Sequence, residues 1–237
     1  MDERKLVVLY GSQTGTAQDV AEQIGREGQR KHLLVKVQSL DDYNIAQLVE
    51  ERFVIFVVAT TGQGDPPDNM NKFWRFILRR SLPQDSLQSL TFALLGLGDS
   101  SYLKFNYIAK KLFKRLQQLG ARELMPIGLA DDQHELGAEA VIDPWLRACM
   151  ENIMTVYPLP ADLQPISQDV LLPSKFKITL HDGASASAIE HNSSLSSVYD
   201  EDNPFYAKML SNARVTADDH WQDVRLICLD LSSSGKC

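Results

Sequence analysis

The chain has 237 residues, of which 44% are hydrophobic and 23% are charged, a balance typical of globular domains and not of disordered or fibrous chains. Its formal net charge of -7 argues against a nucleic-acid-binding surface and favours acidic surfaces that bind basic partners. The three cysteines lie far apart without metal-binding spacing, and no segment resembles a signal peptide or a membrane span. We therefore expect a monomeric cytoplasmic protein that binds neither membranes nor nucleic acid.

Apolar strands and amphipathic helices alternate along the first two thirds of the chain. Strands are expected at residues 6–10, 34–40, 53–59, 92–97 and 124–129. Helices are expected at residues 17–31, 44–51, 68–80, 107–119 and 143–156. Asp143 and Pro144 have the residue types preferred at the N-cap and first position of the last helix. This alternation predicts an α/β fold with a doubly wound, five-stranded parallel sheet.

The apolar patterns also place two strands within the sheet. The continuous apolar run at residues 53–59 is typical of a strand buried on both faces, whereas the alternation at 34–40 is typical of an edge strand. The short helix between them is expected to turn Ile45, Leu48 and Val49 toward the core.

The loop GSQTGTA, residues 11–17, joins the first strand to a helix N-terminus, where backbone N–H groups and the helix dipole favour a phosphate. Ser12, Thr14 and Thr16 add hydroxyl groups, and Gly15 permits a positive φ and close backbone approach. The loop lacks the Gly-Lys-Ser/Thr ending of an ATP site and the G-x-G-x-x-G of a dinucleotide site. A phosphate held by amides and hydroxyls, or an ordinary polar turn, remain as the two interpretations.

Two further loops follow buried strands. Thr60, Thr61 and Gly62 could meet the polar edge of a flat heterocycle, and Tyr102 could lie over its face, although a rigid turn and a surface tyrosine are the simpler alternatives. A receiver domain is excluded because it needs a phospho-accepting aspartate where this chain has Ala59 and Thr60. Serine hydrolase chemistry is excluded because no G-x-S-x-G is present.

The composition and hydrophobic pattern of the sequence change after residue 157. Prolines punctuate the following segment, and residues 182–197 are rich in Ala, Ser and small polar residues, which predicts a linker with a low-complexity part. Strands are expected at residues 176–180, 206–216 and 223–231. Two or three strands cannot bury a sheet face alone, so we expect an incomplete β segment that begins a second domain.

The motifs GSQTGTA, ATTGQGDPPDN and LGLGDSSYLKFN, in this order and at these strand ends, resemble the three flavin-binding loops of the diflavin reductases, the group that includes cytochrome P450 reductase and methionine synthase reductase. The likeness covers residues 6–157 and resumes at residues 203–227. It implies a flavodoxin-like FMN-binding domain over residues 6–156, a linker over 157–202, and the start of a ferredoxin-reductase-type FAD-binding domain over 203–237.

The same resemblance assigns FMN-binding residues, and it implies no catalytic side chain and no metal site. The residues that would cradle the phosphate are Ser12, Gln13, Thr14, Gly15, Thr16 and Ala17. The residues that would flank the isoalloxazine and ribityl chain are Ala59, Thr60, Thr61, Gly62, Leu97, Gly98, Asp99, Ser100, Ser101, Tyr102, Leu103, Lys104, Phe105 and Asn106. Tyr102 would stack on one flavin face and Asp132 would complete the pocket. Thr61 stands where several relatives have an aromatic residue, which implies a less covered second face.

The resemblance also implies a function. In the full enzyme electrons pass from NADPH to FAD, then to FMN, then singly to an acceptor, which in the branch serving cytosolic iron–sulfur protein assembly is an anamorsin-like protein. The FAD and NADPH sites are not complete here, so we do not expect this chain alone to oxidise NADPH. Loop aspartates would disfavour an anionic reduced flavin and form an acidic docking face. They are Asp65, Asp68, Asp99, Asp131 and Asp132. The alternative hypothesis is a non-catalytic interaction protein that docks the acceptor without reducing it.

Overall fold

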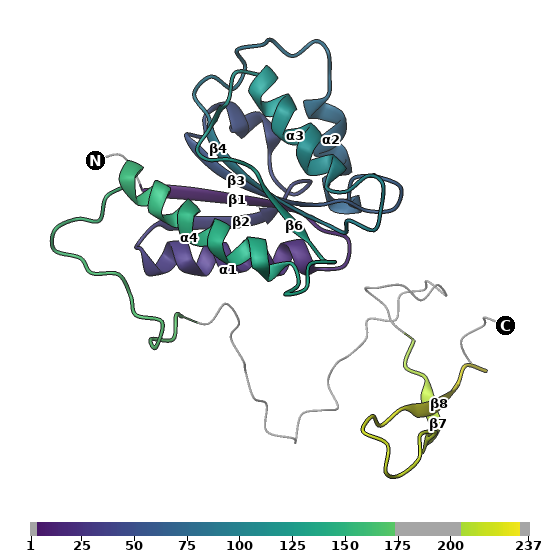
Figure 1. Ribbon diagram of the computed structural model, residues 1–237. Coiled ribbons are helices and arrows are strands. Elements are labelled where there is room, and N and C mark those ends of the chain that lie inside the picture. Colours follow the sequence, from purple (N-terminus) through teal and green to yellow (C-terminus); the bar gives the residue numbers. More distant parts are fainter. Residues whose placement is uncertain (1–3, 174–204, 233–237) are drawn as a thin grey trace, which may run out of the picture. The chain divides into compact units, whose positions relative to one another are not determined.

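The structure, a computed structural model, describes residues 4–173 and 205–232 (Figure 1). The chain divides into two compact units, Met1–Lys175 and Phe176–Cys237. Among the residues described, no helix has the length and apolar character needed to cross a membrane. The strand expected at residues 176–180 and the low-complexity segment at 182–197 lie outside the described residues.

The first unit is a parallel sheet with helices on both faces. Its strands are β1 (Lys5–Gly11), β2 (Leu34–Ser39), β3 (Phe53–Ala59), β4 (Thr91–Gly98), β5 (Arg122–Glu123) and β6 (Gly128–Asp131). The strand order is β2-β1-β3-β4-β5, with β6 also paired to β4. Every pair is parallel, which confirms the predicted doubly wound fold.

Two helical layers cover this sheet. The α-helices are α1 (Thr16–Arg30), α2 (Asn71–Ile77), α3 (Tyr107–Gln118) and α4 (Glu139–Val156). Two short 3₁₀ helices, η1 (Ile45–Val49) and η2 (Asp68–Met70), precede β3 and α2. Figure 1 shows α1 and α4 on one face of the sheet and α2 and α3 on the other.

Each face has its own hydrophobic core, and the central strand β3 contributes to both. Because side chains alternate along a strand, Val54 and Phe56 pack in the α2–α3 core, while Ile55 and Val57 pack in the α1–α4 core. The prediction of a strand buried on both faces is thus confirmed. The prediction that the second strand lies at the edge is also confirmed, since β2 pairs only with β1.

The predicted fifth strand, residues 124–129, is wrong in its bounds. The fifth position of the sheet is filled first by β5 and then by β6, which both pair with β4. Pro126 lies between them and has no N–H to donate to a ladder. Its carbonyl instead accepts a hydrogen bond from Nε1 of Trp145 at 3.3 Å. The interruption therefore ties the sheet edge to α4.

The predicted start of the last helix at Asp143 and Pro144 is also wrong. Helix α4 begins at Glu139, and Pro144 lies inside it. The additional turn buries Ile142 beside Trp145 in the α1–α4 core. This burial offsets the one backbone hydrogen bond that the proline removes.

The segment expected as a helix at residues 44–51 is the 3₁₀ helix η1. Leu48 is buried and Ile45 packs against the core as predicted, but Val49 is 51% exposed. Because a 3₁₀ helix has three residues per turn, residues 45 and 48 share a face and residue 49 points elsewhere. The inward placement of Val49 was therefore wrong.

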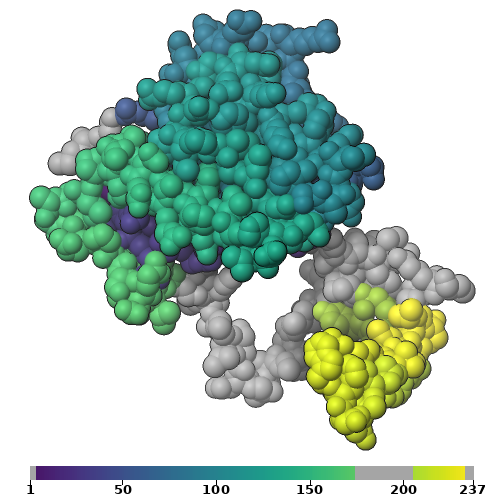
Figure 2. All heavy atoms as spheres, in the orientation of Figure 1, coloured from purple at the N-terminus to yellow at the C-terminus, as the bar shows by residue number. Residues whose placement is uncertain are grey.

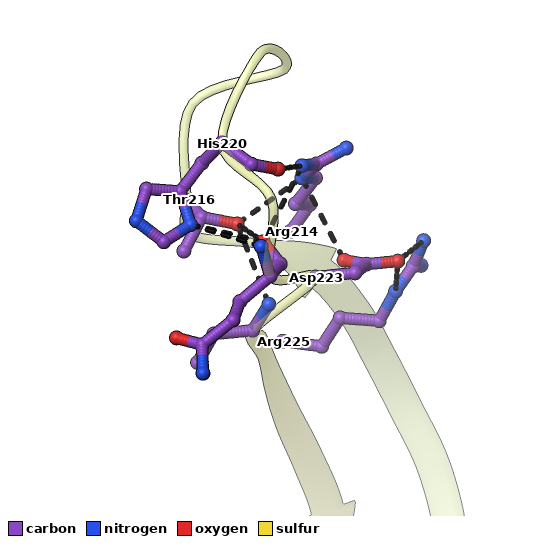
Figure 3. A network of polar contacts seen from close by, with 7 residues as sticks. Arg214, Thr216, His220, Asp223 and Arg225 are labelled. Atoms are coloured by element: carbon purple, nitrogen blue, oxygen red, sulfur yellow. Dashed lines mark hydrogen bonds and ion pairs between the residues drawn. The ribbon is translucent and has the colours of Figure 1, made fainter.

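The described part of the second unit is an antiparallel hairpin of β7 (Lys208–Arg214) and β8 (Arg225–Asp230), which confirms the strands expected there. An arginine organises its loop (Figure 3). Arg214 donates to Oγ1 of Thr216 at 3.1 Å and to the carbonyl of His220 at 3.0 Å. Asp223 lies 3.7 Å from Arg214 and 2.9 Å from Arg225, so one carboxylate bridges both strands' arginines.

The contact between β4 and α3 yields a test of the packing. A Cβ at Gly96 would lie 2.5 Å from Cβ of Ala109, and neither atom can move without its backbone. We expect Gly96→Ala to lower the free energy of unfolding by about 1–3 kcal/mol, measured by urea denaturation. The double variant Gly96→Ala, Ala109→Gly should recover part of the loss, because the methyl group is moved and not added. Simple additivity of the two changes would contradict this account.

Candidate functional site

The predicted site segments all follow the carboxyl ends of parallel strands. The loop at residues 12–17 follows β1, the loop at 60–62 follows β3, the loop at 99–106 follows β4, and Asp132 follows β6. The strand order reverses between β1 and β3, and in open α/β sheets ligands bind outside the carboxyl ends of the strands at such a point. The topology therefore brings the segments to one edge of the sheet.

The first loop leaves a helix N-terminus open. Gly15 is the N-cap of α1, with φ of +106° and no side-chain hydrogen bond to the helix end. The space beside it is open, since a Cβ added there would meet no atom within 4 Å. The first backbone bond of the helix runs from the N–H of Asp19 to the carbonyl of Gly15 at 2.9 Å, so the preceding N–H groups have no helical acceptor. Thr14 and Thr16 are exposed beside them. This arrangement suits an anion.

A second loop fixes the shape of the first. The N–H of Ser12 donates to Oδ1 of Asn69 at 2.8 Å, and Oγ of Ser12 accepts from the N–H of Gly15 at 3.1 Å. Gln13 and Asp68 exchange two hydrogen bonds, both of 2.9 Å. Sequence reasoning missed Asn69, whose only signal is its place between a Pro-Pro turn and a helix.

The loops after β3 and β4 enclose a cavity of about 720 Å³, a size that accommodates a nucleotide-sized ligand. It is lined by Thr60, Gly62, Gln63, Gly98, Asp99, Ser101, Tyr102, Leu103, Lys104, Phe105 and Asn106. Gln63 was not predicted. The loop at residues 12–17 and Asp132 lie at the same sheet edge without lining this cavity. The second and third predicted loops thus line one cavity, and the anion-binding end of α1 lies at the same edge of the sheet.

Asn106 holds the floor of the cavity in place. It is fully buried with φ of +52°, and its Nδ2 donates to the carbonyl of Ala130 at 2.9 Å. A Cβ at Gly98 would lie 3.0 Å from both the side chain and the backbone N of Asn106, so a larger residue there would crowd Asn106. Within the described residues, Oδ1 of Asn106 is a buried acceptor without a hydrogen-bond partner. That atom lies against Gly96 and Gly98 and is not exposed to the cavity, so the group that fits FMN is the open helix end, which suits its phosphate.

The exposed aromatic of the third loop is Tyr102, which lines the cavity with 58% of its surface exposed. Its neighbour Leu103 is fully exposed. In the second loop, Thr61 exchanges two backbone hydrogen bonds with Asp65, of 3.0 and 2.8 Å. Tyr102 is exposed and can therefore cover a ring. Thr61 and Asp65 instead close a tight turn that contains Gly62 and Gly64, both of positive φ.

Two aspartates hold the third loop. The carboxylate of Asp131 accepts from the N–H groups of Ser100 at 2.8 Å and Gln133 at 3.0 Å. Asp99 accepts from the N–H of Ser101 at 2.8 Å and from Nε2 of Gln133 at 3.1 Å. These hydrogen bonds, chiefly from Ser100 and Ser101, hold the pKa of each carboxyl below its usual value. Both aspartates are thus ionised supports of the loop at neutral pH.

The described residues hold no group of three or more side chains suited to a metal ion. Cys149 is buried in α4, and burial raises the pKa of its thiol to about 12. The thiol therefore stays protonated and unreactive at neutral pH.

The lowered pKa values of Asp99 and Asp131 give a pH dependence. Because folding depresses these pKa values, their stabilisation of the loop is complete above the ordinary Asp pKa of about 3.9 and is lost as pH falls through the depressed values. Amide hydrogen exchange of Ser100 and Ser101, corrected for intrinsic rates, should show constant protection near neutral pH and a loss below about pH 4. Asp131→Asn should weaken protection of Ser100 at neutral pH and flatten the dependence. Exposed Asp143→Asn is the control, and an equal effect there would contradict this assignment.

Comparison with known proteins agrees with this geometry. The family described as Flavodoxin matches residues 8–145. The NADPH-dependent diflavin oxidoreductase 1 of Xenopus laevis is 51% identical and that of Mus musculus 54% identical, each over 99% of this chain. The chain spans 40% of the length of these relatives.

A solved structure, a cysteine-to-alanine mutant of flavodoxin from Pseudomonas aeruginosa, is 28% identical with a TM-score of 0.52, and the match covers 63% of this chain and 98% of that one. A flavodoxin domain binds FMN, and the open helix end and the cavity provide places for the phosphate and the ring. The sequence match over most of the first unit and the shared sheet architecture lead to one conclusion: the chain belongs to the flavodoxin family.

Proposed function

We propose that this chain is the FMN-binding electron-transfer part of an NADPH-dependent diflavin reductase, which passes electrons from NADPH through FAD and FMN to an acceptor protein. The observation that carries the proposal is the pairing of an open helix N-terminus at Gly15 with a 720 Å³ cavity at the same sheet edge. The 51% and 54% identity to relatives named as such reductases supports it. We further propose an anamorsin-like iron–sulfur assembly protein as acceptor and a monomeric, cytoplasmic protein.

The chain's own residues bind and orient the cofactor. The N–H groups of the first turn of α1, with Thr14 and Thr16, hold the phosphate without a cationic side chain. Tyr102 covers one face of the ring and leaves the other side to the loop of Thr60 and Gly62, which also lines the cavity. When bound, FMN supplies the one-electron and two-electron redox chemistry. The protein supplies position and local electrostatics.

The role of Tyr102 is tested with two variants. Tyr102→Ala should weaken FMN binding by about tenfold, because an aromatic stack contributes about 1 kcal/mol beyond the buried area. Tyr102→Phe keeps the ring and should bind FMN within about twofold of the unmodified chain. Flavin fluorescence quenching gives both dissociation constants, and equal affinities for the two variants would refute stacking by Tyr102.

The phosphate site is tested by comparing FMN with riboflavin, which lacks the phosphate. FMN should bind at least about tenfold more tightly, because the helix end and hydroxyls act only on the phosphate. Thr14→Glu should remove most of this preference by charge repulsion, while Gln23→Glu, farther along α1, should not. Equal affinity of the unmodified chain for both flavins would contradict the assignment of the phosphate site to the helix end. Absence of any flavin binding would rule out the proposed function.

The acceptor is tested with the FMN-loaded chain after chemical reduction. Mixing with an anamorsin-like protein under anaerobic conditions should return the flavin absorbance to its oxidised spectrum as the acceptor's iron–sulfur absorbance is bleached. A small-molecule oxidant serves as the control for competence of the reduced chain. Reoxidation by the small oxidant but not by the protein would disprove this acceptor and leave the FMN-binding role standing.

A further inference from the structure

The charges of this acidic chain are strongly segregated. Residues 71–122, which include α2 and α3, contain ten of the chain's 24 Lys and Arg residues but only two of its 31 Asp and Glu residues. The rest of the chain is correspondingly acidic. Such a separation is not required by the fold, because α1 and α4, on the other face of the sheet, carry mixed charges.

The basic side chains gather on one surface. Arg115 of α3 donates to the carbonyls of Ile77 at 2.7 Å and Arg79 at 2.6 Å, and Nζ of Lys111 lies 5.8 Å from the ring of Trp74 in α2. The two helices are therefore in contact, and Figure 2 shows their blue and teal spheres as contiguous surface. The cations of this surface, called here the basic face, are Lys72, Arg75, Arg79, Arg80, Lys104, Lys110, Lys111, Lys114 and Arg115.

The basic face lacks compensating charge. In the described ranges none of its cations forms an ion pair, whereas basic residues elsewhere do, as Lys5 does with Glu51 at 2.8 Å. Arg79 lies over Phe76 at 4.8 Å and Lys110 over Phe105 at 4.9 Å, so aromatic rings and not carboxylates hold the side chains. Unpaired cations close together raise the local potential and favour an anionic partner.

The basic face reaches the flavin cavity. Lys104 lines the cavity, and its Nζ lies 5.5 Å from the centre of the Tyr107 ring. Nζ of Lys111 lies 5.0 Å from the centre of the same ring. Tyr107 is itself 37% exposed. A partner bound over α2 and α3 would thus contact the same edge of the cavity that Tyr102 and Leu103 form.

We propose that the basic face binds an acidic surface or segment of a protein partner and so guides that partner to the flavin cavity. The proposal rests on the proposed electron-transfer function for its location and adds the chemistry of the partner. It adds a second, oppositely charged surface to the expected acidic docking face, since Asp99 and Asp131 stay ionised while they accept loop hydrogen bonds.

The limited size of the basic face favours a protein over other polyanions. Helix α3 has 12 residues and α2 has seven, so the longer helix extends about 18 Å. A membrane surface or an extended nucleic acid would also meet the acidic remainder of the chain and be repelled by it. A local cluster of carboxylates pairs with the cations alone, and the exposed Tyr107 and Leu78 offer apolar contacts typical of protein interfaces.

The test uses two charge-reversal variants of equal net charge. Arg75→Glu with Lys114→Glu alters the basic face, and Arg26→Glu with Arg147→Glu alters exposed positions of α1 and α4. In the described residues, no hydrogen bond or ion pair involves these four side chains, so both variants should fold. The probe is fluorescein-labelled poly-L-glutamate of about 20 residues, with binding to the FMN-loaded chain followed by anisotropy.

We expect the peptide to bind the unmodified chain, the basic-face variant to bind about tenfold more weakly, and the control variant to bind within about twofold. Added salt should weaken binding, because the Debye length falls to about 8 Å at 0.15 M ionic strength. An equal loss in both variants would overturn the proposal, as would tighter binding of phosphatidylserine vesicles or an oligonucleotide.

Measuring flavin binding as well as peptide binding distinguishes failure of the basic-face proposal from failure of the proposed electron-transfer function. Retained flavin binding in the basic-face variant, measured by fluorescence quenching, shows that its fold and cofactor site are intact. If that variant fails to fold, Arg75→Gln with Lys114→Gln replaces it and should weaken peptide binding by about threefold. A chain that binds FMN but not the peptide refutes the basic face alone, and a chain that binds the peptide but not FMN refutes only the electron-transfer role.

Discussion

The buried side chain of Asn106 is the contact on which the cavity between the loops after β3 and β4 depends. Its amide joins the end of β4, through close contact with Gly96 and Gly98, to the carbonyl of Ala130 in β6. Its left-handed backbone also begins α3. Asn106 therefore anchors the end of the loop at residues 99–106, links β4 to β6 and is the N-cap residue of α3. The floor of the cavity is therefore buried and hydrogen-bonded, whereas its rim carries the exposed Tyr102 and Leu103.

Backbone contacts around the cavity explain why so few side chains are needed there. The N–H of Thr60 donates to the carbonyl of Leu97 at 3.1 Å, and that of Asp132 donates to the carbonyl of Gly98 at 2.9 Å. Each loop therefore continues the hydrogen-bonding pattern of the sheet beyond the last strand residues. The backbone at the start of each loop is thus held by the sheet itself and loses little freedom when a ligand binds.

The fold followed from the sequence because periodicity reports burial directly. The uninterrupted apolar run of β3 and the alternation in β2 predicted their central and edge positions correctly. The errors fall where a tertiary contact overrides a local rule. Pro144 is tolerated inside α4 because Ile142 is buried, and Pro126 splits the fifth strand. The Ser12–Asn69 hydrogen bond joins residues far apart in sequence, so no local pattern could reveal it.

The loop aspartates illustrate the corresponding limit for function. From sequence, a cluster of acidic residues beside a flavin suggests repulsion and an acidic docking face. In the structure, Asp99 and Asp131 receive four hydrogen bonds between them and hold the loop that carries Tyr102. Their charge still bears on the cavity, but their lowered pKa values come from these local donors. In the described residues, the cations of α2 and α3 form no ion pairs. The cavity therefore lies between ionised loop carboxylates and the cations of α2 and α3.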